Sequence, residues 1–434
     1  MMENGVADPG RPGVTDANAP GAGRAKAARL AALGLAVIAA VLAGRLLLIA
    51  YRAAADPAHG FVSHYTASRL VLEGADISTF YDDARMTREV QRFEPGVTDF
   101  FGANPPTMAF TAMPVAWLDY STARLVWTLL STVVWLAIVF WLGRTCRLPD
   151  SWVAGLVALA ALFQPALEHA RHAQFHVVPV LLLVLVAWRT LKRRPRLAGA
   201  SLAAALVLKT SGLLFWPLLI ARRRWQALDG GIVLFLVALL ASLPVGGAAA
   251  WVLFGYRAAG LAQSGSLSVT AYQTLHGLVR RLTVTDPQWN PSPAIPFEYG
   301  AIAGTVLAVV LLIVALILID RRRDHDLAFA AISALSLALM PHSLDYHYVL
   351  AIFPIAVLLS RLHAQPRSVA FWLLALATFL IAADLPYRSP RLADGVIALI
   401  AYPKLYGALL LAGLALLDAR AGNGPEKPAR QTRT

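Results

Sequence analysis

Long apolar stretches recur along almost the whole chain, and they constrain its fold more than any other feature. A helix needs about 20 consecutive apolar residues to cross the hydrocarbon core of a bilayer. Only 15% of the 434 residues are charged and 58% are hydrophobic, whereas soluble domains average about 25% charged residues. The sequence therefore predicts an all-α polytopic integral membrane protein. We expect spans at about 28–51, 120–142, 151–168, 175–191, 230–249, 299–319, 326–341, 346–361, 368–384 and 394–417.

The stretch 197–221 is predicted to form a broken hairpin. Basic residues flank it on both sides, at 192–196 and 222–224, and such clusters favour the cytoplasmic side. A segment that leaves and returns within this length consists of two short limbs, and Lys209-Thr210-Ser211-Gly212 interrupts the apolar run. Irregular backbone at membrane depth is tolerated where it lines a cavity. Counting two limbs gives about twelve membrane segments, with both termini cytoplasmic.

The chain divides into a disordered cytoplasmic tail at 1–27, a single membrane domain at 28–419, and a second cytoplasmic tail at 420–434. The first span is too long for a typical signal peptide, which indicates an uncleaved anchor. Two long hydrophilic stretches, about 52–119 and 250–298, fall on the outer side. Within the first, 62–74 and 82–93 are predicted to be interfacial amphipathic helices, and the apolar run 107–118 is too short to span.

Charge and motifs exclude several classes of function. The 38 Lys and Arg residues exceed the 25 Asp and Glu residues, a net charge of +13, but the excess is an orientation signal rather than a nucleic-acid footprint. The sequence contains no Walker motif and no G-x-G-x-x-G motif. A lone cysteine, Cys146, cannot form an internal disulfide. Eight of the ten histidines fall on the predicted outer side, which places any chemistry there: 59, 64, 169, 172, 176, 276, 342 and 347.

An ordered set of short motifs resembles glycosyltransferase family 87, a GT-C family of polyprenol-phosphate-mannose-dependent mannosyltransferases and their relatives. The opening signature is His59-Gly60-Phe61-Val62-Ser63-His64-Tyr65-Thr66-Ala67, in which Gly60 replaces the acid typical of the family. The later motifs are Asn104-Pro105-Pro106, Ala123 to Trp127, Ala173-Gln174-Phe175-His176, Lys209-Thr210, Tyr272-Gln273-Thr274-Leu275 and Ser343 to Tyr348.

The resemblance implies an enzyme that transfers a sugar from a polyprenyl-phosphate donor without using a nucleotide. The sugar would be mannose or another hexose or pentose, and the acceptor an envelope glycolipid, polysaccharide or protein. Composition and topology indicate a bacterial inner membrane with the active site facing the periplasm or exterior. The resemblance implies no organic cofactor and leaves the need for a divalent cation open.

Such a transfer needs a general base for the acceptor hydroxyl and cations for the leaving phosphate. Asp56, just beyond the first span, is the first candidate base, with Asp345 and Asp82 as alternatives. Lys209, a charge inside an apolar hairpin, is a functional candidate by position alone. The predicted phosphate ligands are Lys209, Arg281, His342 and His347. The predicted contacts to sugar or acceptor are Gln174, His176, Tyr65, Asn104 and Gln273.

Three other interpretations compete with the enzyme. His169, His172 and His176 have helical spacing suited to a metal, but no cysteine lies nearby to complete a set, and we predict no metal site. A transporter or flippase of lipid-linked sugars would share a basic and polar cavity, although transporters often show paired broken helices. A non-catalytic assembly protein could keep the fold without the base, and Gly60 keeps this alternative open.

Overall fold

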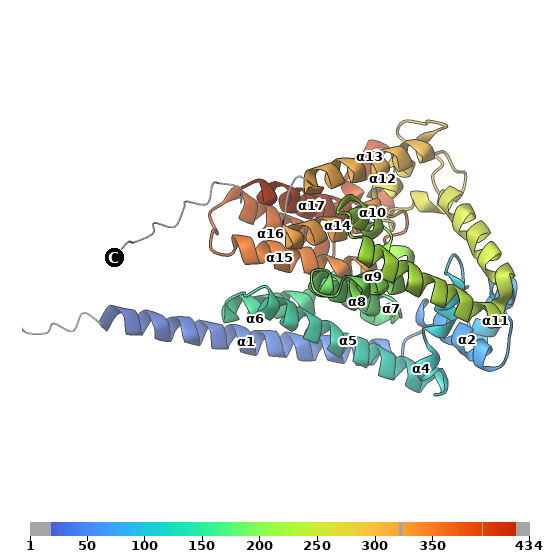
Figure 1. Ribbon diagram of the computed structural model, residues 1–434, viewed down its shortest axis with the longest axis horizontal. Coiled ribbons are helices and arrows are strands. Elements are labelled where there is room, and N and C mark those ends of the chain that lie inside the picture. Colours follow the sequence, from blue (N-terminus) through green and yellow to red (C-terminus); the bar gives the residue numbers. More distant parts are fainter. Residues whose placement is uncertain (1–18, 321–323, 393, 422–434) are drawn as a thin grey trace, which may run out of the picture.

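The computed structural model describes residues 19–320, 324–392 and 394–421, and every regular element among them is a helix (Figure 1). The described residues contain no strand, only one isolated bridge between Asp286 and Asn290. The predicted all-α membrane fold is confirmed.

The longer helices are α1 (Ala19–Ala53), α5 (Tyr120–Thr145), α6 (Asp150–Leu162), α8 (Val177–Thr190), α9 (Pro195–Leu208), α11 (Trp225–Gln263), α13 (Gly300–Asp320), α14 (His325–Leu339), α15 (Ile352–Leu362), α16 (Val369–Ala382) and α17 (Pro403–Ala421). The shorter α-helices are α2 (Phe61–Leu72), α3 (Asp83–Gln91), α4 (Met113–Ala116), α7 (Gln164–His172), α10 (Phe215–Ala221) and α12 (Leu275–Thr283). The 3₁₀ helices are η1 (Ile77–Tyr81), η2 (Pro106–Phe110), η3 (Thr210–Gly212), η4 (Gly265–Ser268), η5 (Asp345–Ala351), η6 (Pro390–Leu392) and η7 (Gly395–Ala401).

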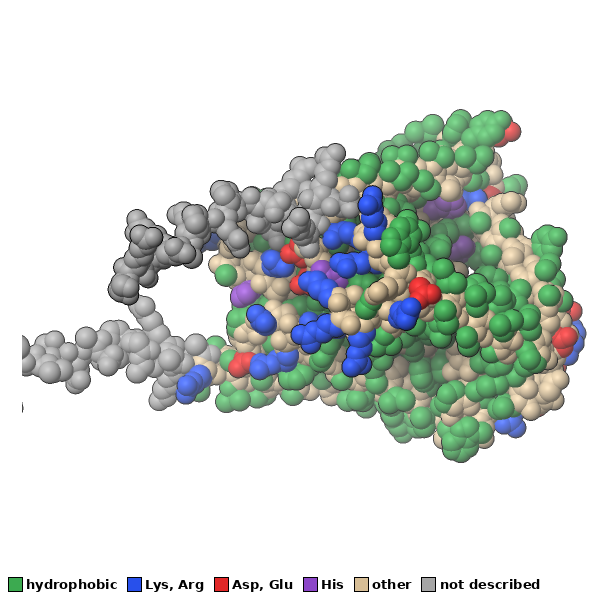
Figure 2. All heavy atoms as spheres, in the orientation of Figure 1, with side chains coloured by type: hydrophobic (Ala, Val, Ile, Leu, Met, Phe, Trp, Pro, Cys, Tyr) green, Lys and Arg blue, Asp and Glu red, His purple; other side chains and the backbone are tan. Residues whose placement is uncertain are grey.

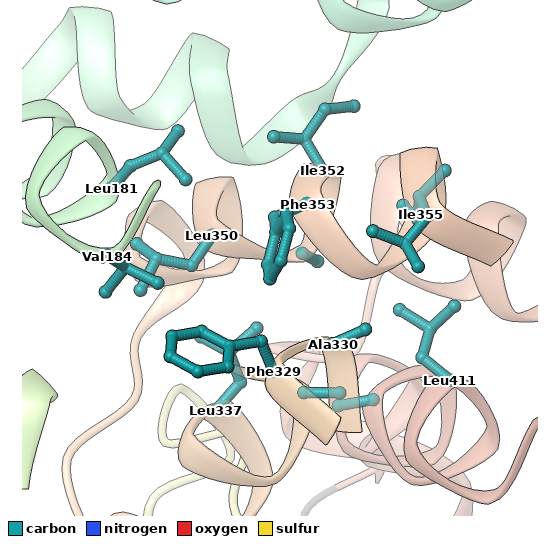
Figure 3. Close-up of a cluster of buried hydrophobic side chains, with 14 of the residues drawn as sticks. Leu181, Val184, Phe329, Ala330, Leu337, Leu350, Ile352, Phe353, Ile355 and Leu411 are labelled. Atoms are coloured by element: carbon teal, nitrogen blue, oxygen red, sulfur yellow. The ribbon is translucent and has the colours of Figure 1, made fainter. Parts of the chain in front are cut away.

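The helices form one packed bundle around a large apolar core. Helix α1 runs beside α5 and α6, while α14 to α17 pack together at the other side of α8 (Figure 1). In the centre, side chains from α8, α14, α15 and α17 interlock, among them Leu181, Phe329, Phe353 and Leu411 (Figure 3). This core fixes the ends of α8, α14 and η5, which supply the site described below.

The broken hairpin predicted at 197–221 is present. Helix α9 ends at Leu208, Lys209 is extended with φ −160° and ψ 141°, and α10 begins at Phe215 after a turn of 3₁₀ helix. Both basic clusters lie close together, and Figure 2 shows Lys and Arg side chains gathered over the ends of α8, α9 and α10. The two limbs therefore start and finish on the same side, and Lys209 lies at their turn.

Helix α11 is longer than the predicted span 230–249, because it continues into the predicted outer loop as far as Gln263. Pro244 lies inside it, and Gly247 has a φ of 59°, a value that glycine adopts at little cost. These two residues divide α11 into two limbs at a kink. Part of the region predicted as a hydrophilic loop is therefore helical.

The two predicted interfacial helices form close to their expected bounds, as α2 and α3, but α2 is not a surface helix. Most of its residues are buried, including His64 and Ser68. The Ser68 hydroxyl donates to the carbonyl of Ala109 at 2.7 Å, which brings η2 and the following turn over α2. The apolar run 107–118 thus forms η2 and α4 and covers a helix that the sequence pattern placed at the interface.

Within the part of the chain that the structure describes, five helices are long and apolar enough to cross a membrane: Arg29–Ala53, Tyr120–Thr145, Trp225–Gln263, Gly300–Ile319 and Asp345–Leu362. Two bent pairs, α6 with α7 at 48° and η7 with α17 at 56°, raise the count to seven if each pair is one span. Four further apolar helices, α8, α9, α14 and α16, are shorter than a typical span. The predicted count of about twelve is not confirmed.

The crossing of α9 and α11 depends on glycine. A Cβ at Gly199 would lie 1.6 Å from the carbonyl oxygen of Ala227, so the two backbones could not keep this distance. Close approach through small residues is a common way for membrane helices to associate. Because α9 leads directly to Lys209, this crossing positions the hairpin turn.

We expect Gly199→Ala to destabilise the protein by about 1–3 kcal/mol, since overpacking forces backbone shifts of that cost. Thermal unfolding of purified protein in one detergent measures the effect. Gly155→Ala is the matched control, because a Cβ at Gly155 has no atom within 4 Å. Equal unfolding temperatures for the two variants would contradict the tight α9–α11 crossing.

Candidate active site

Lys209 is held at the turn of the hairpin by an amide from a distant loop. Its Nζ donates to Oδ1 of Asn104 at 2.7 Å, and Asn104 Nδ2 donates to the carbonyl of Phe101 at 2.6 Å. The amide of Asn104 is oriented by this second bond, so it presents its oxygen to the ammonium group. Two prolines follow Asn104 and restrict the backbone at this point. The structure thus brings together two of the predicted site residues.

A small cavity of about 40 Å³ adjoins Lys209. The end of α14 and the start of η5 form its other walls and contribute His342, Ser343 and His347. Three predicted phosphate ligands, Lys209, His342 and His347, therefore share one cavity.

The histidines of the site form a connected set whose tautomers follow from their partners. Leu344 N–H donates to Nδ1 of His347 at 3.0 Å, so a neutral His347 carries its proton on Nε2. The Nε2–H of His347 then donates to Nε2 of His176, which lies 3.2 Å away. His176 then carries its own proton on Nδ1.

Three imidazole nitrogens of the site are buried without a hydrogen-bond partner among the described residues: Nδ1 of His64, Nδ1 of His176 and Nε2 of His342. An unsatisfied buried polar group costs about 1–3 kcal/mol, and native structures contain few of them. Several such groups near one half-buried ammonium are suited to an anionic, hydroxyl-rich ligand. Burial lowers the pKa of His64 to about 3 and that of His342 to about 4, so both are neutral near pH 7.

An apolar groove of about 480 Å³ lies next to this cavity, on the other side of the segment that joins α14 to η5. Its walls come mainly from α13 and from the ends of α11, α12 and α14. His276 and Arg280 also line it, and Figure 2 shows histidine side chains in the recess between α11 and α13. The groove is therefore largely hydrocarbon with a few polar groups.

The three predicted bases lie outside this cavity. Asp56 is exposed in the turn after α1. Asp82 caps α3 by accepting from Arg85 N–H at 3.0 Å, which lowers its pKa. Asp345 is buried and accepts hydrogen bonds from Tyr387 and, at 2.8 Å, from Arg388.

Three of the remaining predicted residues form structural contacts. Arg281 donates to the carbonyl of Trp289 at 2.8 Å and pairs with Asp394. The amide of Gln273 bonds backbone groups of Thr270, Ala401 and Lys404. The hydroxyl of Tyr65 donates to the carbonyl of Leu118 at 2.7 Å.

Gln174 lies against the loop before α2. A Cβ at Gly60 would be 2.1 Å from Nε2 of Gln174, so the amide of Gln174 would have to move if residue 60 had a side chain. The φ of Gly60 is 98°, which a side chain would also strain.

Sequence reasoning missed His64 and Tyr346. His64 belongs to the opening signature, and its ring lies 6.2 Å from that of His176. The ring of Tyr346 contacts that of His347 in a tilted arrangement, with 4.5 Å between ring centroids. The sequence pattern did not indicate that α2 is covered by other segments, so it gave no reason to single out a histidine on the buried side of this helix.

A buried ion cluster anchors η5 to the C-terminal helices. Asp345 lies 3.4 Å from Nζ of Lys404, which is itself fully buried and donates to the carbonyl of Ile381. Arg388 joins Asp345 and also approaches Glu168 at 4.0 Å. Because His347 follows Asp345 by two residues, the cluster positions the histidine.

The fold and the site define a class, an all-α integral membrane protein with a cation site beside an apolar groove. Residues 103–343, more than half of the chain, match the model of glycosyltransferase family 87. The chain belongs to glycosyltransferase family 87, as the motifs predicted.

A relative from Mycobacterium tuberculosis is named polyprenol-phosphate-mannose-dependent alpha-(1-2)-phosphatidylinositol mannoside mannosyltransferase. It is 24% identical over 292 residues, which cover 63% of this chain and 65% of the relative. The match thus spans just under two thirds of the relative's length. No solved structure matches the chain.

We expect Lys404→Met to destabilise the fold by about 1–3 kcal/mol, because the buried Asp345 carboxylate keeps Arg388 but loses its second cationic partner. Chemical unfolding in detergent measures the loss. Arg196→Met is the control, since the Arg196–Asp229 pair is exposed on both sides and such pairs contribute about 0–1 kcal/mol. Similar stabilities for both variants would refute the anchoring role of the cluster.

Proposed function

We propose that this protein transfers a sugar from a polyprenyl-phosphate donor to an envelope glycolipid, polysaccharide or protein at the outer face of the membrane. The observation that carries the proposal is a half-buried lysine, with unpartnered imidazole nitrogens near it, next to an apolar groove. The name of the mycobacterial relative supports a polyprenyl-phosphate sugar as the donor class.

Lys209 has the position needed to bind the donor phosphate. Its ammonium group would stabilise the negative charge that develops on the phosphate as the sugar departs. His342 and His347 line the same cavity and add neutral imidazole groups for phosphate oxygens or sugar hydroxyls. Asn104 holds Lys209 in place, so it acts as a positioning residue.

The groove beside α13 would hold the polyprenyl chain. Apolar side chains dominate its walls, and the segment at the end of α14 lies between the groove and the cation cavity, with Leu339 and Pro341 lining the groove and Met340 and His342 lining the cavity. A donor whose phosphate binds at Lys209 would thus place its polyprenyl chain in the groove.

Transfer by the purified protein in nanodiscs tests the function. Radiolabelled polyprenyl-phosphate-mannose is the first donor, with a lipid extract of the host as acceptor, and other polyprenyl-phosphate sugars follow. We expect Lys209→Met to lower kcat/KM by about 10²–10³-fold, the usual cost of removing one charge-stabilising donor. Lys192→Met, which changes an exposed lysine, is expected to keep full activity.

The outcome also separates the enzyme from its alternatives. No transfer with any donor, together with movement of donor across vesicle membranes, would favour a flippase. Donor binding with neither transfer nor movement would favour a non-catalytic assembly protein. Either result would overturn the proposed transferase.

The lipid groove has its own prediction. Val309 lines the groove, whereas its neighbour Val310 is similarly exposed but does not. We expect Val309→Trp to raise KM about tenfold for a long-chain donor, a loss of about 1.4 kcal/mol of binding, and to change KM less for a short-chain donor. Val310→Trp should leave both values near wild type. Equal effects of the two variants would place the chain elsewhere.

A further inference from the structure

A carboxylate that no sequence motif singled out, Asp99, lies in the loop leading to Asn104. Its side chain is partly buried. Oδ2 accepts from the backbone N–H of Gly60 at 2.8 Å, and Oδ1 accepts from the N–H of Phe100 at 2.9 Å. Two backbone amides therefore fix the carboxylate, and a carboxylate oxygen can accept a further hydrogen bond.

The loop of Asp99 reaches the cation site, because Asn104, five residues later, accepts from Nζ of Lys209 at 2.7 Å. Gly60, which donates to Asp99, directly precedes α2, and the ring of His64 on that helix lies 6.2 Å from the ring of His176. Asp99 is therefore fixed between two segments that supply groups to the cation site.

The contact between Asp99 and Gly60 depends on the shape of the loop before α2. Gly60 has a positive φ, and its missing side chain leaves room for the amide of Gln174. With that backbone, its N–H points to Asp99. Three segments far apart in the sequence, at 60, 99 and 174, thus meet at the start of α2.

The other acids that could serve as bases are less suitable. Asp345 is buried, and its carboxylate is paired with Arg388 and Lys404. Asp82 caps a helix. Asp56 is exposed, and the structure gives it no contact with the cation site among the described residues.

We infer that Asp99 is the general base of the transfer reaction, an inference that rests on the proposed function. The acceptor hydroxyl donates its proton to Asp99 while its oxygen forms a bond to the anomeric carbon. The bond between that carbon and the phosphate oxygen breaks, and its electron pair leaves with the polyprenyl phosphate, which Lys209 stabilises. The proton passes from Asp99 to water when the product departs.

The test is Asp99→Asn in the purified full-length protein. Its amide oxygen can still accept from Gly60, but the group no longer takes up a proton. We expect kcat to fall by about 10²–10⁴-fold, the usual contribution of general base catalysis. Donor binding should stay within about twofold of wild type, because a base acts on the acceptor. Asp384→Asn, at an exposed acid, is the control and should keep wild-type activity.

Each outcome is decisive. Wild-type transfer that is lost in Asp99→Asn with donor binding retained supports the base. Wild-type transfer that survives in Asp99→Asn, or that is lost in Asp56→Asn instead, overturns Asp99 as the base and leaves the proposed function standing. A wild-type protein that transfers no sugar overturns the proposed function and the base together.

Discussion

The hydrogen bond between Lys209 and Asn104 is the interaction on which the site depends. A charge at the turn of an apolar hairpin is costly unless it is paired, and here the partner comes from a loop more than 100 residues earlier in the chain. The bond therefore joins the hairpin to the segment that covers α2. The prolines after Asn104 and the glycine contact at Gly199 both restrict the geometry of this bond, because each fixes the backbone of one partner.

Much of the architecture could be predicted because apolar periodicity and basic clusters are local signals. The break in the hairpin at Lys209 follows from one polar interruption between two basic clusters, and the structure has it at that residue. The burial of α2 could not be predicted, since Arg69 and Glu73 give the helix a polar edge while the covering comes from η2 and α4. The kink of α11 at Gly247 was missed for a related reason. The sequence was interpreted as a span that ends near the kink and is followed by a loop, whereas in the structure these residues belong to one long helix.

The candidate site divides in the same way. Lys209, His342 and His347 could be chosen from the sequence because a charge in an apolar run and histidines beside a span are unusual on their own. Aspartate and glutamate residues are common in loops, so the sequence alone does not indicate which of them lies near Lys209. The choice of Asp56 followed its distance from the first span along the chain, whereas the meeting of Asp99 with Gly60 is set by tertiary structure alone.

The groove beside α13 has a kinetic consequence. Its walls include side chains that face outward from the bundle, such as Ile302 and Val306, which are 60% and 56% exposed. A lipid that enters between such residues passes sideways from the bilayer to the cation site and never crosses water. Occupancy of the groove then depends on the number of donor molecules per unit area of the leaflet. Dilution of the aqueous phase therefore leaves the transfer rate unchanged, whereas dilution with inert lipid lowers it.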